Sequence, residues 1–398
     1  MPHEPRSADQ LRWFGAAQLL ALVRAEPGIT RAAAAARLGI GSGGAADLLG
    51  RLRAEHLLDE QPAPAQGRGR PTTVLVAHPQ GPLVLAADVR AADWQLAVAG
   101  FDGEPTTIDA GKHTGKRLPR LLTELGAAIA AAHRREPQRI GAVSVSVAGT
   151  VSDSRLVQFT PRGWKDVDLA VLTAALPAHA QLPLLIGNDA TLAGLAEARS
   201  GAARGARSAL HLMVAAGLGG TLVVDGVPVA GARGAAGEYG HVPFGDPRVV
   251  CPCGARGCWD LAIDGRALAR HLGDGPPADP VGYAQALLDA PATAGTRRAF
   301  AKVATALGAG IGGLVNLHDP DVVTLGGLAV GLRAAAPEAF ATAYLDGLMA
   351  YRKTSAPPVR DGLHGDNGPL YGAVVQGLDH LTTEGGLAEW ARNRAHSD

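Results

Sequence analysis

The chain has 398 residues, and its 37 basic and 37 acidic side chains give a formal net charge of zero. This balance excludes a global attraction to polyanions, so any contact with nucleic acid has to be local. The length predicts two or three domains. Aromatic residues make up only 4% of the chain, so the core has to be built mainly from Ala, Val and Leu.

The N-terminal sequence MPHEPRSADQLRW lacks the apolar core that a signal peptide requires. No apolar run is both long enough and free enough of turn residues to span a membrane. All the cysteines lie in one cluster, a pattern that fits a metal site in a reducing cytoplasm. We therefore expect a cytoplasmic protein without a membrane partner.

Three helices are predicted near the N-terminus, over residues 16–25, 31–38 and about 42–56. Thr30 and Ser42 stand where the caps of the second and third helices are expected, and Gly39 breaks the chain between them. A helix followed by a glycine turn and a second capped helix is the helix-turn-helix pattern. The basic run GRGRP at residues 67–71 precedes a predicted strand at 73–76, which is typical of a wing.

Residues 78–82 form the predicted boundary between a DNA-binding domain, residues 1–78, and a second domain, residues 79–398. Strands alternate with helices beyond it, which is typical of an α/β architecture. The strands are expected at residues 84–89, 94–101, 140–147, 184–186, 209–214, 221–224 and 321–325, and the helices at 118–134, 189–200 and 296–316. Two glycine-rich strand pairs far apart in the sequence predict a duplicated fold. Its two lobes cover about 79–187 and 188–398, with a return of the C-terminal helix to the first lobe left open.

The three cysteines, Cys251, Cys253 and Cys258, fall within eight residues, and His241 precedes them in the run GEYGH. Three thiolates and one imidazole form a tetrahedral zinc set. A disulfide is disfavoured, because an odd number leaves one thiol over and cysteines one residue apart cannot easily bridge. We predict one structural zinc per chain, and a catalytic zinc with three protein ligands and a bound water is the alternative.

These motifs resemble the ROK family (repressors, open reading frames and sugar kinases) in its repressor branch, similar to xylose and N-acetylglucosamine repressors. The resemblance covers nearly the whole chain and includes the winged helix, the GEYGH run, the CPCGARGC zinc signature and the turn Gly326–Gly327. It implies an actin-like (ribonuclease H-like) two-lobe sugar-kinase fold behind a winged helix-turn-helix domain. It also implies a sugar-sized cleft and assembly as a homodimer or homotetramer.

Active kinases of this family begin their first hairpin with the pattern DxGGTK, whose glycines let backbone N–H groups approach phosphate. Residues 88–93 here read DVRAAD, so both glycines and the threonine are missing and Asp93 replaces the lysine. The second phosphate loop, normally Gly-Thr-Gly, lies within AAGLGG at residues 215–220 and lacks the hydroxyl. We predict no useful ATP binding and no phosphoryl transfer. The alternative is that Arg90 replaces the lost donors.

The sugar side of the site is better preserved. The resemblance implies that a sugar contacts Asn188, Asp189, Glu238, His241 and Asp260, with Asp189 as a vestigial catalytic base. Asp260 is one methylene shorter than the glutamate that is usual at its position. His241 would also bind zinc through one ring nitrogen. In the alternative, the cleft is vestigial and these polar groups are satisfied by backbone and water.

In repressors of this type the second helix of the motif enters the major groove and the wing follows the minor groove. The candidate DNA contacts are Arg31, Ser42, Arg51, Arg53, Arg68 and Arg70. The start of the third helix, GSGGAAD, is poor in base-reading side chains. Nine arginines and seven carboxylates through residue 80 give a net charge of only +2. A head used only for protein contacts is the alternative.

Together these patterns predict a DNA-binding transcriptional regulator, a repressor of carbohydrate metabolism that senses a sugar or sugar derivative. Its expected partners are operator DNA and a carbohydrate effector. Two alternatives differ in kind: an ATP-dependent sugar kinase with an appended winged helix, and a regulator that acts without a ligand.

Overall fold

The computed structural model describes residues 8–63, 73–113, 118–152, 155–159, 163–177, 180, 182–232 and 234–395. The chain forms two compact units, and each is composed of separate stretches of sequence. The first unit comprises residues 1–145, 169–186 and 373–398, and the second comprises residues 146–168 and 187–372. The domain boundary near residue 78 stays a prediction, because both sides of it lie in the first unit.

The N-terminal head is a winged helix-turn-helix fold. It contains α1 (Ala8–Ala25), α2 (Arg31–Leu38), α3 (Ser42–Ala54), β1 (Leu58–Pro62) and β2 (Thr73–Ala77). The hydroxyl of Thr30 accepts a hydrogen bond from the N–H of Ala33 at 3.2 Å, which caps α2 as predicted. Gly39 ends α2 with a φ of 66°, a left-handed conformation that favours glycine.

The predicted cap of α3 was wrong. Gly41 is the N-cap, in an extended conformation (φ −68°, ψ 162°), and no side chain caps this helix. Ser42 is the first helical residue, because the chain turns into the helix one residue earlier than the serine suggested. The predicted wing tip, with Arg68 and Arg70, lies in residues 64–72, which are outside the described part of the chain.

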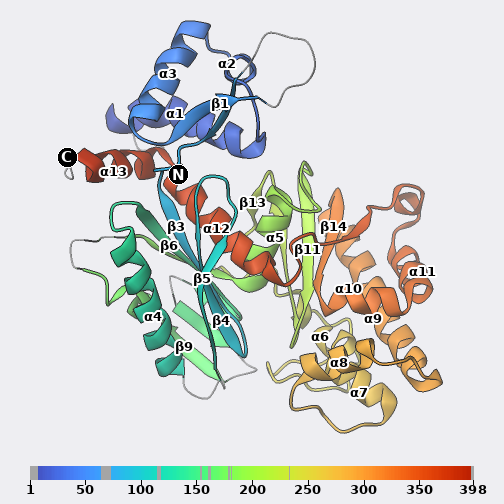
Figure 1. Cartoon of the computed structure of the whole chain (residues 1–398). Helices are drawn as coiled ribbons and strands as arrows, with labels where there is room; N and C mark the ends of the chain where they lie inside the picture. The colour runs from blue at the N-terminus through green and yellow to red at the C-terminus, as the bar shows by residue number, and fades with distance from the viewer. Residues whose placement is uncertain are drawn as a thin grey trace. The chain divides into compact units, whose positions relative to one another are not determined.

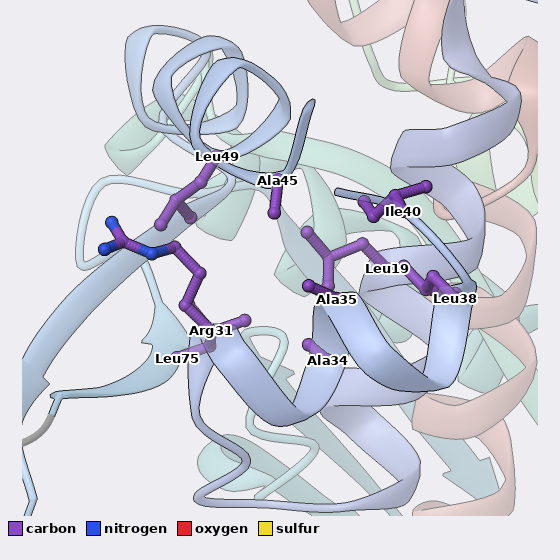
Figure 2. Close-up of a pocket in the computed structure, with 9 residues that line it drawn as sticks. All are labelled: Leu19, Arg31, Ala34, Ala35, Leu38, Ile40, Ala45, Leu49 and Leu75. Carbon is purple, nitrogen blue, oxygen red and sulfur yellow. The ribbon is translucent and has the colours of Figure 1, made fainter. Parts of the chain in front are cut away.

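A cavity of about 10 Å³ lies among the helices of the head, at the lower limit of what holds one water molecule. Figure 2 shows its lining, in which the guanidinium of Arg31 lies on the opposite side of the group from Leu38 and Ile40. Arg31 is the one charged residue in a lining that is otherwise apolar: Leu19, Ala34, Ala35, Leu38, Ile40, Ala45, Leu49 and Leu75. The cavity is a packing gap in the core of the head.

A five-stranded sheet of order β10-β6-β3-β4-β5 lies mainly in the first unit. Its strands are β3 (Leu83–Val89), β4 (Asp93–Ala99), β5 (Thr106–Lys112), β6 (Ile140–Val147) and β10 (Leu184–Asn188). Strand β4 ends two residues before the predicted limit, because residues 100–103 form a turn closed by the Gly103 N–H and the Gly100 carbonyl at 3.0 Å. The helix α4 (Leu118–Arg135) buries residues four apart, Leu121, Leu125 and Ile129. It packs against β4 and the short helix η2 (Ala170–Thr173).

The second unit repeats this topology, with a sheet of order β13-β12-β11-β14-β15. Its strands are β11 (Ser208–Val214), β12 (Leu218–Val224), β13 (Val227–Pro228), β14 (Val322–Gly327) and β15 (Val359–Asp361). In both sheets three consecutive strands form a meander, and the next two strands are added beside its first strand. The duplication expected from the two glycine-rich strand pairs is confirmed.

Helices of the second unit contact this sheet and one another. They are α5 (Asp189–Arg199), η3 (Tyr239–His241), α6 (Asp260–Ile263), α7 (Gly265–Leu272), α8 (Pro280–Asp289), α9 (Ala294–His318), α10 (Leu328–Ala335), α11 (Pro337–Gly347), η4 (Ala350–Ser355) and η5 (Gly365–Asn367). Figure 1 shows α9, α10 and α11 gathered beside β14. A separate antiparallel sheet consists of β7 (Thr150–Ser152), β8 (Arg155–Phe159) and β9 (Trp164–Asp168).

Helix α9 is long and apolar enough to cross a membrane by length and composition, although 56% of its most apolar window is buried in the fold. A helix was expected here, at residues 296–316, but no apolar run was expected to be long enough to span a membrane, and by length and composition alone this helix does qualify. A Cβ at Gly308 would come within 2.4 Å of the Phe340 carbonyl oxygen, and one at Gly310 within 2.2 Å of the Trp259 ring. The glycines therefore allow close packing, as in a core helix.

The chain ends with α12 (Gly368–Leu381) and α13 (Glu384–Ala395). Helix α12 begins in the second unit and ends in the first, where α13 packs against α1 of the head (Figure 1). The indole N–H of Trp390 donates to the Glu55 carbonyl at 2.8 Å, and Arg24 pairs with Asp379 at 2.8 Å. The Arg394 guanidinium lies 2.7 Å from Nδ1 of His56. Helices α12 and α13 thus contact the head through an ion pair and hydrogen bonds.

Candidate metal centre and the adjoining polar chain

Four candidate ligand atoms, one each from His241, Cys251, Cys253 and Cys258, all lie within 4.8 Å of one another. The Sγ atoms of Cys253 and Cys258 are 3.7 Å apart, and Sγ of Cys251 is 3.9 Å from Nδ1 of His241. Two sulfur ligands of a tetrahedral zinc ion are separated by about 3.8 Å, because each Zn–S bond is ~2.3 Å long. The donor set therefore fits zinc, and His241 would bind it through Nδ1.

Glycines let this loop turn twice within a few residues. The Cys251 N–H donates to the Ala255 carbonyl at 2.8 Å, and the Gly254 N–H returns to the Cys251 carbonyl at 2.9 Å. Gly254 and Gly257 have φ values of 97° and 67°, which a residue with a side chain rarely adopts. The loop thus depends on the glycines between its cysteines as well as on the cysteines.

The metal loop is anchored to the core by the residue that follows its last cysteine. Trp259 is fully buried, and its indole N–H donates to the Ala306 carbonyl of α9 at 3.0 Å. The ring of Phe244 meets it edge-on, with ring centroids 5.7 Å apart. These contacts fix one end of the loop.

Burial raises the pKa of the Cys258 thiol to about 12 and also raises that of Cys251. Clustered thiolates in a partly apolar loop repel one another unless a cation compensates their charge. A bound zinc ion would supply that compensation, so that metal binding and thiol deprotonation are coupled. Its chemistry here would be structural, since four protein ligands complete a tetrahedral shell.

The other face of the His241 ring meets a carboxylate. Nε2 of His241 lies 4.0 Å from Oε2 of Glu238, and Oε1 of Glu238 accepts a hydrogen bond from the Thr150 hydroxyl at 2.9 Å. A carboxylate that accepts a hydrogen bond from the second nitrogen of a ligating histidine fixes the tautomer and orientation of the ring. At 4.0 Å Glu238 lies beyond hydrogen-bond distance, so it contributes a nearby negative charge beside His241.

The GEYGH run lies directly against β12. A Cβ at Gly237 would approach the Gly220 carbonyl oxygen to 2.2 Å, and one at Gly240 would approach that of Leu218 to 2.5 Å. Only glycine fits at these two positions. The motif glycines thereby hold Glu238 and His241 beside the second sheet.

Asn188 and Asp189 stand at the start of α5, and their side chains bond to each other. The amide oxygen of Asn188 caps the helix by accepting from the Thr191 N–H at 3.0 Å. Its amide nitrogen donates to the Gly149 carbonyl at 2.9 Å and to Oδ1 of Asp189 at 3.0 Å. The same Oδ1 accepts from the Ala190 N–H at 2.8 Å. The amide of Asn188 is thus used within the protein, which leaves the Asp189 carboxylate as the better candidate for a ligand.

Because Gly149 adjoins Thr150 in the sequence, these contacts join into one polar chain. It runs from Asp189 through Asn188 and the 149–150 turn to Glu238, and then to His241 at the metal loop. Every member lies in the second unit. Four of the five residues predicted to contact a sugar are thereby brought together.

The fifth, Asp260, points elsewhere. It is 6% exposed, and its Oδ2 lies 3.3 Å from Nη2 of Arg266. Arg266 also bonds to Oδ2 of Asp264 at 2.5 Å and to the Ala216 carbonyl at 3.2 Å. Asp260 thus belongs to a cluster that holds the loop between β11 and β12, which is where the second phosphate loop was predicted.

The β3–β4 loop, where the first phosphate loop was predicted, is held by an arginine as well. Nε of Arg90 donates to Oδ2 of Asp88 at 2.7 Å, and Asp88 is 1% exposed. The Arg90 N–H donates to the Asp93 carbonyl at 2.9 Å, and Nη1 lies 3.9 Å from the Asp93 carboxylate. The backbone donor of Arg90 is therefore already used inside the hairpin.

The three described arginines that were predicted to contact DNA have intramolecular partners too. Arg53 lies 2.6 Å from Asp59, and Arg31 lies 3.6 Å from Glu60. The guanidinium of Arg51 sits 5.6 Å from the centre of the Trp13 ring. Ser42 is exposed at the start of α3.

Two residues of this region, Thr150 and Arg266, were not predicted from the sequence. Thr150 was not singled out, because a threonine after a glycine turn carries no distinctive signal. Arg266 was missed because its partners, Asp260 and Ala216, are assembled only by the fold. Its spacing from Asp264, which caps α7 by accepting from the Arg266 N–H at 2.9 Å, was the one local hint.

The family model described as the ROK family matches residues 85–377. A kanosamine kinase from Amycolatopsis mediterranei is 32% identical over 266 residues, which are 64% of this chain and 82% of the kinase. A putative xylose repressor from Caldicellulosiruptor is 29% identical over 280 residues, which are 65% of this chain and 69% of that protein.

One solved structure resembles the chain over nearly its full length. The crystal structure of a ROK family transcriptional regulator, a homolog of the E. coli MLC protein, aligns with a TM-score of 0.74. The alignment covers 96% of this chain and 99% of that one, at 19% identity. At that identity the likeness establishes the fold, including the head.

Proposed function

The chain belongs to the ROK family, and from this premise we propose that it is a DNA-binding transcriptional regulator that senses a carbohydrate without phosphorylating it. We further propose that it represses genes of carbohydrate metabolism and acts in the cytoplasm as a homodimer or homotetramer on operator DNA. The xylose repressor among its relatives supports this reading. One structural zinc per chain, bound by His241, Cys251, Cys253 and Cys258, completes the proposal.

The observation that carries the proposal is the state of the two phosphate loops. Each has an arginine bonded to the protein's own carboxylates, Arg90 to Asp88 and Arg266 to Asp264. A nucleotide would have to displace these bonds, and no lysine or threonine in either loop would replace them as a phosphate ligand. The polar chain at Asp189 and Glu238 keeps the groups that a sugar hydroxyl requires.

A route for the signal follows from the same residues. Helix α5 begins at Asp189 and touches the start of α12, where a Cβ at Gly372 would come within 1.9 Å of the Leu192 carbonyl oxygen. Helix α12 continues towards α13, which contacts the head through Trp390 and Arg394. A sugar that binds differently to two arrangements of α5 would shift the head and change its affinity for DNA.

A ligand panel tests the sensor. Purified protein is mixed with neutral hexoses and pentoses, amino sugars and sugar phosphates, and its unfolding temperature is measured, because a bound ligand raises it. We expect one class to raise the temperature in the wild type and not in Asp189→Asn. Asp225→Asn, an exposed turn residue, serves as the control of equal charge. A panel without any shift contradicts the sensor and favours a regulator that acts without a ligand.

The sugar kinase is the second candidate, favoured by the intact Asn188–Asp189 pair and by the kanosamine kinase among the relatives. Protein incubated with ATP, magnesium and the same panel should show no turnover above that of Asp189→Asn. Turnover that this substitution abolishes would establish the kinase instead. A DNA fragment selected from a random pool, and released by the sugar that raises the unfolding temperature, would complete the case for the regulator.

A further inference from the structure

Two arginines of the head, Arg31 and Arg53, are paired with acidic residues of strand β1. Nε of Arg53, in the last turn of α3, donates to Oδ1 of Asp59 at 2.8 Å, and its Nη2 lies 2.6 Å from the same oxygen. Nη2 also lies 3.8 Å from Oε2 of Glu60. Both carboxylates belong to β1, which leads into the predicted wing.

Glu60 also reaches an arginine from the other helix of the motif. Nη1 of Arg31, the first residue of α2, lies 3.6 Å from Oε2 of Glu60. The second oxygen of Glu60 accepts from the Thr73 hydroxyl of β2 at 2.9 Å, so the carboxylate is held in place from across the hairpin. One carboxylate thus joins α2, α3 and the strand pair.

The two carboxylates are fixed more firmly than the arginines. The side chains of Arg31 and Arg53 are 50% and 51% exposed, whereas those of Glu60 and Asp59 are 15% and 35% exposed. The Glu60 N–H donates to Oδ1 of Asp59 at 2.8 Å, and this bond, together with Arg53, lowers the pKa of Asp59. Exposed ion pairs contribute little to folding, so the guanidinium groups can exchange partners.

We propose that Asp59 and Glu60 set the DNA affinity of the head by competing with backbone phosphates for Arg53 and Arg31. This inference rests on the proposed DNA-binding function and adds that the head's own carboxylates lower its affinity for DNA. In the free protein the carboxylates neutralise the arginines that face outwards. When DNA binds, the guanidinium groups transfer to phosphate oxygens, and the acidic residues oppose the approach of the phosphates.

This competition would also account for the low net charge of the head. The strand sequence Leu58-Asp59-Glu60 places two negative charges beside two of the arginines that would meet phosphate. Weak phosphate binding keeps a regulator from being trapped on non-operator DNA, because the electrostatic contacts are independent of sequence. Selectivity then depends on contacts to the bases, which carry the sequence information.

The test uses DNA of mixed sequence, since the phosphate term does not require the operator. The full chain is titrated with a fluorescent duplex of about 30 base pairs, and anisotropy is followed over a series of salt concentrations. Asp59→Asn and Glu60→Gln keep the shape of each side chain and remove its charge. We expect each to tighten binding about threefold to tenfold at low salt and to steepen the salt dependence by about one counterion per released arginine.

The control is Asp109→Asn, which removes one exposed charge on β5, outside the head. It should change the affinity much less than either head variant, and unfolding temperatures should verify that all variants are folded. Wild-type binding that both head variants leave unchanged or weaken overturns the competition, and weakening would mean that the carboxylates orient the arginines towards DNA. If neither the wild type nor the variants bind at low salt, the DNA-binding function itself fails, and the competition fails with it.

Discussion

The hairpin loops of the two repeated sheets are both held by an arginine, but the arginine comes from different places. In the β3–β4 loop Arg90 bonds to Asp88 of the preceding strand, two residues away. In the β11–β12 loop Arg266 reaches the Ala216 carbonyl from α7, fifty residues further along the chain. The bond that holds the β3–β4 loop is therefore local in sequence. The bond that holds the β11–β12 loop forms only when the second unit is folded.

This difference has an energetic consequence. Asp88 and Asp264 are both buried, at 1% and 0% exposure, but Arg266 also holds Asp260, which is 6% exposed. The second loop thus depends on two buried carboxylates and one cation, with the metal loop directly adjacent through Cys258. A substitution that destabilises the second unit should therefore also destabilise the β11–β12 loop. The β3–β4 loop should keep its structure.

Loss of the metal should produce the largest difference in stability between the two loops. Cys258→Ser removes a thiolate ligand, and since metal binding also stabilises the folded loop, we expect zinc loss and destabilisation by several kcal/mol, the largest of the expected effects. Hydrogen exchange should accelerate in residues 211–224 and remain unchanged in 83–99. Metal analysis should find one zinc in the wild type and none in the variant.

The chelated wild type is the matched control for this substitution, because it loses the ion and keeps every side chain. It should reproduce the exchange pattern of Cys258→Ser. If a gently purified wild type contains no metal, or if both hairpins loosen equally, the link between the metal loop and the β11–β12 loop is wrong.

Removal of Arg266 should have the next largest effect. Burial raises the pKa of Asp264 in spite of the neighbouring guanidinium, so without Arg266 this carboxyl would have to remain charged and unpaired or take up a proton. Either outcome costs about 3 kcal/mol, as for other broken buried pairs. Arg266→Met should lower the free energy of unfolding in urea by that amount.

Arg266→Lys provides the comparison, since it keeps the charge and loses the planar fork that joins Asp260, Asp264 and the Ala216 carbonyl. It should recover part of the stability. An Arg266→Met protein as stable as the wild type would show that the cluster is solvated and does not hold the loop.

The contrast between the loops also explains what the sequence could predict. The four candidate metal ligands, the loss of the DxGGTK pattern and the pair Asn188–Asp189 are local features, so residue types and spacing were sufficient to single them out, and the structure brings the four candidate ligand atoms within 4.8 Å of one another. Arg266 acts through a bond to the Ala216 carbonyl, fifty residues away in the sequence, so its role could not be read from local spacing. Asp260 pairs with Arg266 because of where α6 begins, and a sequence pattern does not define that boundary. The repeated topology was predictable from strand and glycine order, whereas the short helices of the second unit were not, because their boundaries depend on packing around α9.

A buried histidine distinguishes the second sheet from the first and makes it sensitive to pH. His211 is the fourth residue of β11, where β3 has Ala86, and its Nδ1 lies 2.9 Å from the Thr324 hydroxyl. Burial lowers the pKa of His211 to about 4, against the opposing influence of Glu197. The unfolded chain takes up this proton near pH 6.5, so stability is complete above that pH and falls as the pH decreases towards 4.

Between about pH 7 and pH 5 this group should cost about 2 kcal/mol. His211→Gln removes the titration and keeps a hydrogen-bonding side chain, so the difference in pH dependence between wild type and variant isolates the histidine. Zinc ligands titrate equally in both proteins and cancel. Parallel curves from urea unfolding at several pH values would mean that His211 is hydrated or protonated in the folded state.

The smallest effect is expected at the first loop, and it tests the local character of that closure. Arg90 is 36% exposed and Arg266 only 22%, so water can replace the Arg90 guanidinium beside Asp88 more easily. Arg90→Met should therefore lower the free energy of unfolding by about 1 kcal/mol, less than Arg266→Met. The second hairpin should keep its rate of hydrogen exchange.

Arg90→Met also frees the first hairpin, β3–β4, for contact with nucleotide. We expect no rise in unfolding temperature with magnesium ATP, because Asp93 still opposes phosphate where a kinase has lysine. A rise in Arg90→Met that is absent in the wild type would mean that the arginine alone keeps nucleotide out, and that the rest of the phosphate site has survived.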